Sequence, residues 1–400
     1  MRNLLLAGAA AAALASGTAQ AQMSDDVIKI GMLSDRSGIY ADINGEGSAV
    51  AARLAAEEFG NAINGTKVEI IVGDHQNKAD IAANLTRQWI DTDKVDVVAD
   101  VPNSAAALAV QGITRDKKRI FLMSGPGSTD LTGKECSPYG FLWTWDNHAV
   151  ASSTARALVE QGRKSWFFVT ADYAFGHSLE AEAAKTVKQL GGTVKGSVRH
   201  PLGSPDFSSF LLQAQASGAD VVAFANAGGD TINAVKQAAE FGLPEGGQTL
   251  AGLLLNINDV HALGLDTAQG LMMANSFYWD MNDETRGWSK KFEERTGRKP
   301  SMNQAGVYSA VRHYLQTVKD IGTDDPDKVA ASMRDRPVTD MMMKDARIAA
   351  NGRVFNNMYL FQVKAPGEAK HPWDYLTMLK TIPGEQAYIN PKDSGCPLVK

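Results

Sequence analysis

Polar side chains that suit the binding of an anion follow one of the apolar runs in this 400-residue chain. The run 95–99 is followed by a turn, Pro102-Asn103-Ser104, and then by an alanine-rich segment. Asn103 or Ser104 suits the N-cap of a helix, because a short polar side chain accepts a hydrogen bond from a free amide of the first turn. The other free amides and the positive end of the helix dipole favour an anionic group. An ordinary strand–turn–helix connection is the alternative.

No motif of an enzyme's active site accompanies this turn. G-x-S-x-G, H-E-x-x-H, G-x-G-x-x-G and P-loop strings do not occur, and the seven histidines do not pair at metal-ligand spacing. Asp74-His75 with Ser104 matches a hydrolase set only in composition, because nothing marks Ser104 as a strained nucleophile. We therefore expect a protein that is not an enzyme and that holds neither a cofactor nor a metal.

Apolar runs alternate with helical segments along the chain, and the alternation restarts near residue 149. Apolar strands between helices indicate a parallel sheet that is covered on both faces. Ligands of such sheets bind at the carboxyl ends of the strands, where the polar turns lie. The strands that we expect span residues 27–33, 68–72, 95–99, 120–123, 165–169, 221–225, 249–255, 270–276, 345–348 and 358–363.

The length of the chain suits two lobes rather than one core. The expected fold class is α/β, with two doubly wound parallel-sheet lobes joined by a multi-strand hinge. Residues 26–144 and 273–338 are assigned to lobe 1, residues 145–272 and 339–385 to lobe 2, and residues 386–400 to a tail that returns toward lobe 1.

Residues 1–21 are typical of a cleaved secretory signal, with a basic start, a short apolar core and an Ala19-Gln20-Ala21 end. We expect a protein exported to the periplasm without a lipid anchor, because no cysteine follows the apolar core. The net charge is −5, and the basic residues are scattered rather than gathered into a stripe. This distribution argues against nucleic acid as a partner.

The chain contains two cysteines, Cys136 and Cys396. An even pair in an exported chain indicates a disulfide, which here would tie the C-terminal tail to the first third of the sequence. Two unpaired thiols are the alternative.

In the order and spacing of its loops, the mature chain resembles the periplasmic solute-binding proteins of branched-chain amino acid type, the receptors of ABC importers. The resemblance implies the type I fold of these proteins, an inner-membrane ABC permease as partner, and no enzymatic activity. A monomer is expected, because one docking face must stay free. The motifs that carry the resemblance are Ile28-Lys29-Ile30-Gly31, Ser37-Gly38, Pro102-Asn103-Ser104, Ser124-Gly125-Pro126-Gly127-Ser128-Thr129, Asp172-Tyr173-Ala174-Phe175-Gly176 and Ala227-Gly228-Gly229-Asp230.

The resemblance also implies roles for individual residues. From lobe 1, the positions of Asn103, Ser104, Ser128 and Thr129 grip a ligand carboxylate. Tyr173 closes over the ligand from lobe 2. Further ligand contacts are expected from Ile39, Tyr40, His75, Asn226, Ala227, Gly228, Leu254 and Tyr278. For His75, an ordinary structural role stays open as the alternative.

The chain departs from the resemblance at one position. Amino-acid binders of this type place an acidic residue near Leu254 to pair with the ligand ammonium, and a buried ammonium without a partner costs several kcal/mol. A leucine there favours a ligand without an amino group.

The expected ligand is a small carboxylate, such as a benzoate, a phenylpyruvate or a hydroxycinnamate. Several aromatic residues in the ligand-binding loops offer a surface for a ring, with core packing as the alternative role. The chain also resembles an aromatic-acid branch of the family, which its C-terminal Cys396-Pro397-Leu398-Val399-Lys400 fits. Branched-chain or aromatic amino acids stay open as ligands if Asp230 replaces the missing acid. A ligand sensor for a membrane receptor is a further alternative.

Overall fold

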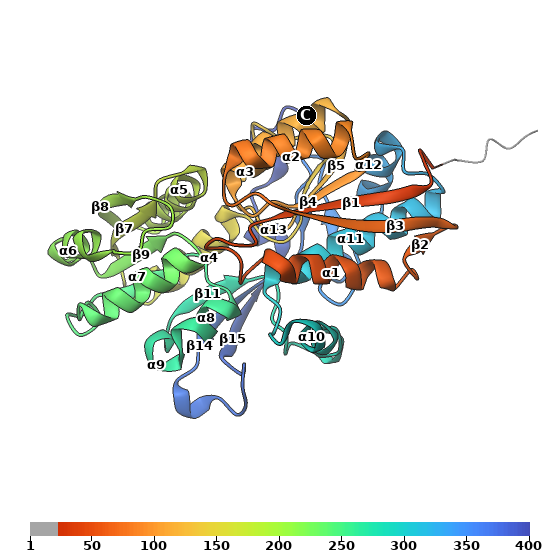
Figure 1. Ribbon diagram of the computed structural model, residues 1–400. Coiled ribbons are helices and arrows are strands. Elements are labelled where there is room, and N and C mark those ends of the chain that lie inside the picture. The colour runs from red at the N-terminus through yellow and green to blue at the C-terminus, as the bar shows by residue number, and fades with distance from the viewer. Residues whose placement is uncertain (1–22) are drawn as a thin grey trace, which may run out of the picture.

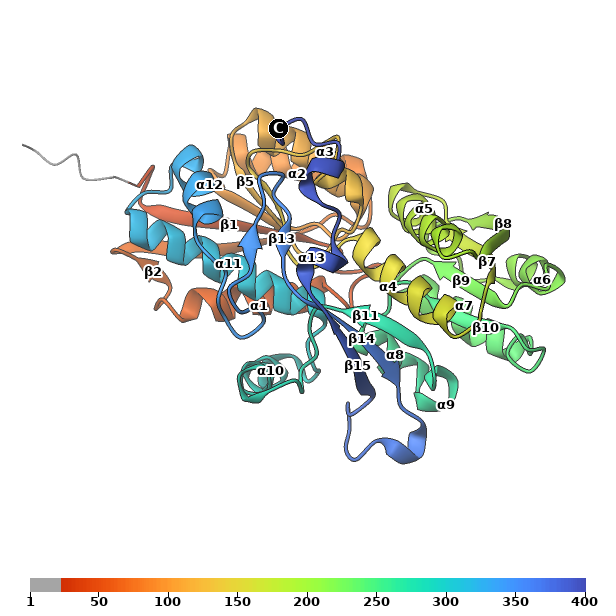
Figure 2. The same ribbon diagram turned by 180° about the vertical axis from the view of Figure 1, so that it is seen from behind.

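The computed structural model describes residues 23–400, so the predicted signal segment 1–21 lies outside the described residues. Two α/β lobes lie side by side, and the chain passes between them repeatedly (Figures 1 and 2). This arrangement confirms the predicted fold class. Within residues 23–400, no helix combines the length and the apolar character that a membrane span requires.

Lobe 1 is built on a six-stranded sheet with the order β2-β3-β1-β4-β5-β6. The strand β2 pairs antiparallel with β3, and the other neighbours are parallel. The short β6 was not predicted, because it spans only three residues. The strands are β1 (Val27–Ser34), β2 (Ala62–Ile63), β3 (Thr66–Asp74), β4 (Val97–Asp100), β5 (Ile120–Met123) and β6 (Gly140–Leu142).

Helices cover both faces of this sheet, with α2 and α3 on one face and α1 and α11 on the other (Figure 1). Alanines on the buried side of α1 allow the helix to approach the sheet closely, since a methyl group takes little space. The helices of lobe 1 are α1 (Gly45–Glu57), α2 (Ala79–Asp91), α3 (Ser104–Asp116), α10 (Asp283–Thr296), α11 (Met302–Ile321) and α12 (Pro326–Asp335), with the 3-10 turn η1 (Thr129–Leu131).

Lobe 2 contains a parallel sheet with the order β10-β9-β7-β8. Its edge strand β8 was missed, because its residues alternate between exposed and half-buried and lack an apolar run. The strands are β7 (Ser165–Ala171), β8 (Thr193–His200), β9 (Val221–Ala225) and β10 (Thr249–Gly252). The helices are α4 (Asn147–Glu160), α5 (Ala174–Gln189), α6 (Ser208–Ala216), α7 (Gly229–Glu240), α8 (Ile257–Leu263) and α9 (Leu265–Ala268).

A three-stranded antiparallel sheet, β11-β14-β15, packs against α4 on the lobe 2 side. The small hairpin β12-β13 instead contacts lobe 1, where Arg353 bridges to Leu142 of β6 and Asn351 donates to the Thr132 carbonyl. Within residues 339–385, the hairpin β12-β13 thus contacts lobe 1, while β14 and β15 belong to the sheet on the lobe 2 side. The elements are β11 (Met272–Asn275), β12 (Arg347–Ile348), β13 (Val354–Phe355), β14 (Met358–Val363), η2 (Pro366–Glu368) and β15 (Leu376–Ile382).

The C-terminal tail returns to lobe 1 through α13 (Gly384–Ala387) and η3 (Pro391–Asp393). Its end is fixed by the disulfide between Cys136 and Cys396, which confirms the predicted pairing. Both cysteines are buried. The alternative of two free thiols was wrong.

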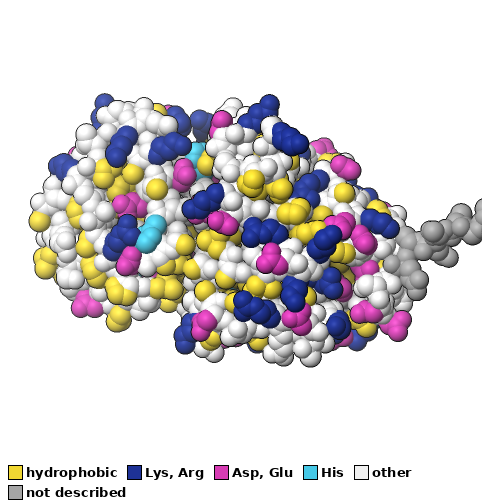
Figure 3. All heavy atoms as spheres, turned by 90° about the horizontal axis from the view of Figure 1, so that it is seen from above, with side chains coloured by type: hydrophobic (Ala, Val, Ile, Leu, Met, Phe, Trp, Pro, Cys, Tyr) yellow, Lys and Arg dark blue, Asp and Glu magenta, His cyan; other side chains and the backbone are white. Residues whose placement is uncertain are grey.

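Charged side chains of both signs are mixed over the face drawn in Figure 3. Their mixing agrees with the 40 basic and 45 acidic residues of the sequence.

We expect the double substitution Cys136→Ala and Cys396→Ala to destabilise lobe 1. The bond closes a loop with a sequence separation of 260 residues, and loop entropy of this size corresponds to up to about 5 kcal/mol. Urea unfolding should show a lower midpoint for the double variant than for the oxidised parent. Reduction of the parent should give the same shift, and an unchanged midpoint would show that the tail is held without the bond.

Candidate functional site

The two lobes touch through backbone atoms at one edge of the interface between them. The amide of Gly229 in lobe 2 donates to the carbonyl of Ile39 in lobe 1 at 3.0 Å. Beside this bond the hydroxyls of Tyr40 and Tyr173 contact each other across the interface. The structure is therefore a closed form, in which the loop 35–44 of lobe 1 meets the turn before α7.

A buried carboxylate shapes the lobe 1 side of this contact. Asp35 accepts hydrogen bonds from the amides of Gly38 at 2.8 Å and Tyr40 at 2.9 Å, and it also contacts Asn77 Nδ2. These bonds curl the loop so that Tyr40 points inward and is buried. Burial and the neighbouring Tyr173 raise the pKa of Tyr40, so its hydroxyl stays protonated at neutral pH.

A small cavity lies behind the Tyr40–Tyr173 contact. Its empty volume is about 220 Å³. Because the Tyr40–Tyr173 contact joins the two lobes beside it, ligand entry on that side requires the lobes to part. The lining residues are mainly aromatic and aliphatic, and they come from both lobes: Tyr40, Ile43, Asn44, Pro102, Gly125, Trp145, Tyr173, Phe175, Ala227, Leu254 and Asn303.

The polar lining side chains belong to a buried hydrogen-bond chain in lobe 1. The indole of Trp145 donates to Asn303 Oδ1 at 2.7 Å, and Asn303 donates to Asn44 Oδ1 at 3.0 Å. Asn44 in turn donates to Asp100 Oδ1 at 2.6 Å, and Ser34 donates to the other oxygen at 2.8 Å. Burial raises the pKa of Asp100 to about 6. This chain fixes one wall of the cavity.

The predicted anion turn lies beside this wall: Pro102 and Gly125 line the cavity, whereas Asn103, Ser104 and Ser128 lie next to them and do not. Asn103 caps α3, because its Oδ1 accepts from the Ala106 amide at 3.0 Å. Ser104 Oγ accepts from the amides of Gly127 at 3.4 Å and Ser128 at 3.3 Å. The structure thus brings the 102–104 and 125–128 turns together, and Ser104 Oγ occupies the point where the amides of Gly127 and Ser128 converge.

The other expected contacts fall into two groups. Tyr40, Tyr173, Ala227 and Leu254 line the cavity, while Ile39 and Gly228 form the contact between the lobes. Thr129 lies 3.4 Å from Ser178 across the interface, oxygen to oxygen. Asn226 is buried, and its Oδ1 accepts from Thr231 Oγ1 at 2.7 Å. These last two side chains lie outside the cavity wall.

The structure places His75 and Tyr278 away from the cavity. His75 Nδ1 accepts from the Asn77 amide at 3.0 Å, and burial lowers the pKa of this imidazole. Tyr278 donates its hydroxyl to the Trp373 carbonyl at 3.0 Å and packs on Phe361. His75 and Tyr278 do not line the cavity, and their ligand contacts stay predictions.

Sequence reasoning missed Asn44, Trp145 and Asn303. They come from the start of α1, from the segment between β6 and α4, and from α11. The spacing of residues along the chain carried no signal that these three positions meet.

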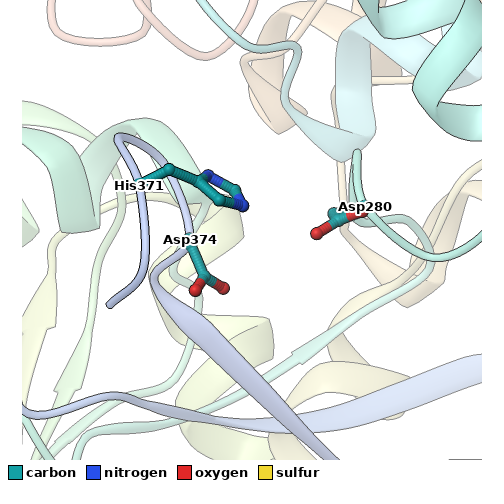
Figure 4. Close-up of side chains that lie close together, drawn as sticks. All are labelled: Asp280, His371 and Asp374. Carbon is teal, nitrogen blue, oxygen red and sulfur yellow. The ribbon is translucent and has the colours of Figure 1, made fainter. Parts of the chain in front are cut away.

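A second polar cluster comprises Asp280, His371 and Asp374. Its ligand-type atoms lie within 4.8 Å of one another, and Figure 4 shows the three side chains converging. Each carboxylate already has a cationic partner, because Lys364 Nζ lies 2.5 Å from Asp374 and Arg286 Nη1 lies 2.9 Å from Asp280. The cluster joins the 366–375 loop to the segment after β11.

Comparison with known proteins identifies the family to which this architecture belongs. A family model described as periplasmic binding protein matches residues 27–369. The chain belongs to the periplasmic binding protein family. This family binds small molecules for ABC transporters and is not enzymatic, as the sequence predicted.

Individual relatives agree with this assignment. The periplasmic binding protein shares 26% identity over 299 residues, 74% of each chain, with the Leu/Ile/Val-binding protein homolog 6 of Brucella melitensis. A crystal structure of a periplasmic binding protein from Burkholderia mallei has 46% identity and a TM-score of 0.92, covering 94% of this chain and all of that one.

Two further solved structures differ in ligand description. A branched chain amino acid ABC transporter periplasmic ligand-binding protein from Burkholderia xenovorans has 38% identity and a TM-score of 0.83, covering 93% of this chain and all of that one. A solute-binding protein from R. palustris, in complex with benzoate, has 22% identity and a TM-score of 0.82, with 93% and 100% coverage. The second shows likeness of fold alone.

Gly228→Ala is expected to hinder closure of the periplasmic binding protein. The φ angle of Gly228 is +56°, and an added Cβ would lie 2.3 Å from the Ile39 carbonyl oxygen. Gly191→Ala is the matched control, because its φ is +78° and nothing lies within 4 Å of an added Cβ. Small-angle scattering should show a larger radius of gyration for Gly228→Ala alone, and equal radii for both variants would contradict this role.

Proposed function

We propose that this periplasmic binding protein captures a small aromatic carboxylate between its lobes and delivers it to an inner-membrane ABC permease. The observation that carries the proposal is the lining of the cavity, which is aromatic and aliphatic and has Leu254 where a counter-charge for an ammonium would be expected. In this account the protein acts as a monomer in the periplasm.

The carboxylate is assigned to the paired turns of lobe 1. Ser104 Oγ accepts from two backbone amides, and its own hydroxyl hydrogen can turn to donate to a ligand oxygen. If the Ser104 side chain moves to another rotamer, the two amides can also donate to that oxygen. Asn103 and Ser128 flank this point and are buried, so their bonds to a charged oxygen would be shielded from water. Hydrogen bonds to a charged acceptor contribute about 1.5–3 kcal/mol each.

The ring is assigned to the aromatic side of the cavity. Trp145 and Phe175 meet edge to face with centroids 6.2 Å apart, and Tyr173 lies 5.8 Å from Phe175. These rings already contact one another, so a ligand ring would pack against their exposed faces once the lobes part, in the offset or edge-to-face contacts that aromatic pairs favour. The benzoate complex of the R. palustris relative supports this choice of ligand class.

Amino acids are the second candidate, favoured by the name of the Burkholderia xenovorans relative. Asp230 is a candidate substitute for the missing acid, because its charge acts on both Tyr40 and Tyr173. However, Asp230 Oδ2 accepts from the Gly203 amide at 3.0 Å, and the residue does not line the cavity.

A thermal-shift screen tests the ligand class. We expect benzoate or 4-hydroxybenzoate to stabilise the protein, and leucine, phenylalanine and isovalerate to leave it unchanged. A ligand at about one hundred times its dissociation constant adds about 2.7 kcal/mol to the free energy of unfolding. Stabilisation by the amino acids alone would contradict the proposal.

Leu254→Glu should reverse the ranking of ligands. A glutamate at this position repels a carboxylate ligand and supplies the missing partner for an ammonium. We expect calorimetry to show benzoate affinity reduced at least tenfold and phenylalanine binding gained. Leu254→Met, which keeps the volume and the apolar character, is the control and should bind benzoate nearly as the parent does. A glutamate variant that keeps its benzoate affinity would refute the assigned role of Leu254.

Asn103→Ala combined with Ser128→Ala should weaken all carboxylate ligands by a similar factor. Both side chains also cap helical turns, so a loss of about 1 kcal/mol in stability is expected alongside. Asn390→Ala, which removes a cap of the same kind from η3 in the tail, controls for that loss. An equal fall in affinity in the control and in the double variant would contradict the assignment of the carboxylate to Asn103 and Ser128.

A further inference from the structure

We propose that Arg353 is a positioning residue of the ligand site, because it fixes the crossover segment 143–146 and thereby the cavity-wall side chain Trp145. The inference deepens the proposed function. It rests on that function only for the measurements of benzoate binding, and not for the spectra without ligand. Arg353 itself touches no ligand, since it lies behind the wall and does not line the cavity.

The crossover segment 143–146 links β6 of lobe 1 to α4 of lobe 2 and has no strand partner along most of its length. Arg353 replaces that partner. Its guanidinium donates to the carbonyls of Trp145 at 2.7 Å and Trp143 at 3.4 Å. The rigid planar fork of an arginine suits such a bridge between two acceptors.

Neighbours of Arg353 bind the Thr144 carbonyl, which lies between the carbonyls of Trp143 and Trp145. Asn356 donates to the Thr144 carbonyl at 3.1 Å, and the hydroxyl of Tyr388 lies 3.3 Å from the same oxygen. Arg353 also donates to Asn356 Oδ1 at 3.3 Å and lies 3.9 Å from the centroid of the Tyr388 ring. Residues from the C-terminal part of the chain therefore bind every carbonyl from Trp143 to Trp145.

The electrostatics favour a fixed position for this guanidinium. Arg353 is 1% exposed, and a buried charge is costly unless it is paired and hydrogen-bonded. Its Nε lies 3.8 Å from Asp146 Oδ2, while Asp146 Oδ1 accepts from the Ala149 amide at the start of α4. The pair thus joins the crossover to the first turn of a lobe 2 helix.

Trp145 transmits this position to the cavity. Its indole donates to Asn303 of α11 at 2.7 Å, and its ring lies against Gly127, where an added Cβ would approach within 2.3 Å. The ring also meets Phe175 of lobe 2 edge to face. A shift of the crossover backbone therefore moves a side chain that contacts both lobes in the closed form.

The experiment uses fluorine NMR of the full-length mature protein labelled with 5-fluorotryptophan, with benzoate titrations by calorimetry. The resonance of Trp145 is assigned by its loss in Trp145→Phe. We expect Arg353→Met to shift or broaden this resonance without ligand and to weaken benzoate binding at least tenfold. Arg353→Lys keeps the charge but not the fork, and it should give smaller effects in the same direction, as should Tyr388→Phe.

Arg334→Met is the matched control. Like Arg353, Arg334 is an arginine of the C-terminal part that donates to backbone carbonyls, and it lies 4.6 Å from the centroid of an aromatic ring, Phe141. Arg334 is half-buried, whereas Arg353 is fully buried. Arg334→Met should leave the Trp145 resonance in place and change the affinity for benzoate less than twofold. We expect this even if its melting temperature falls as far as that of Arg353→Met.

An unchanged Trp145 resonance in Arg353→Met, or an equal change in Arg334→Met, would overturn the inference. If Arg353→Met does not fold, the lysine and Tyr388→Phe variants decide by the same resonance. A parent protein that does not bind benzoate would contradict the proposed ligand, whereas the ligand-free spectra would still decide the role of Arg353.

Discussion

The hydrogen bond from the Gly229 amide to the Ile39 carbonyl sets the geometry on which the rest of the site depends. It brings the backbones of the two lobes into direct contact, which only a glycine turn permits, because any Cβ at Gly228 would collide with Ile39. With that contact made, the hydroxyls of Tyr40 and Tyr173 meet across the interface beside the cavity. A ligand that bridges the lobes shifts the equilibrium toward this closed form by its differential affinity for it.

The closed form is built from elements of different rigidity. The lobe 1 wall is a connected hydrogen-bond chain from Trp145 to Asp100, which positions polar groups before a ligand arrives. The lobe 2 wall is mostly apolar and includes Phe175, Ala227 and Leu254. One lobe thus offers directional contacts and the other offers surface that is buried on closure. Burial of apolar surface contributes about 25 cal/mol per Å².

Much of the fold could be predicted from the sequence because its signals are local. Apolar runs such as 95–99 identified most parallel strands, and the two cysteines identified their bond. The turn at Asn103 was identified by its capping chemistry, and Leu254 was found only through the resemblance to a family. Trp145 and Asn303 were missed because their meeting depends on a crossover and on a helix from distant parts of the chain. The hydrogen bond from Tyr278 to the Trp373 carbonyl also joins residues 95 apart, which the spacing along the chain does not signal.

A crystal structure of the complex with 4-bromobenzoate tests the central claim most directly, because the anomalous signal of bromine locates the ring without bias. The account predicts a bromine peak between the lobes in contact with Trp145 or Leu254, and carboxylate oxygens within hydrogen-bond distance of Ser104 and Ser128. A peak outside the cavity, or a ligand whose carboxylate faces lobe 2, would contradict it.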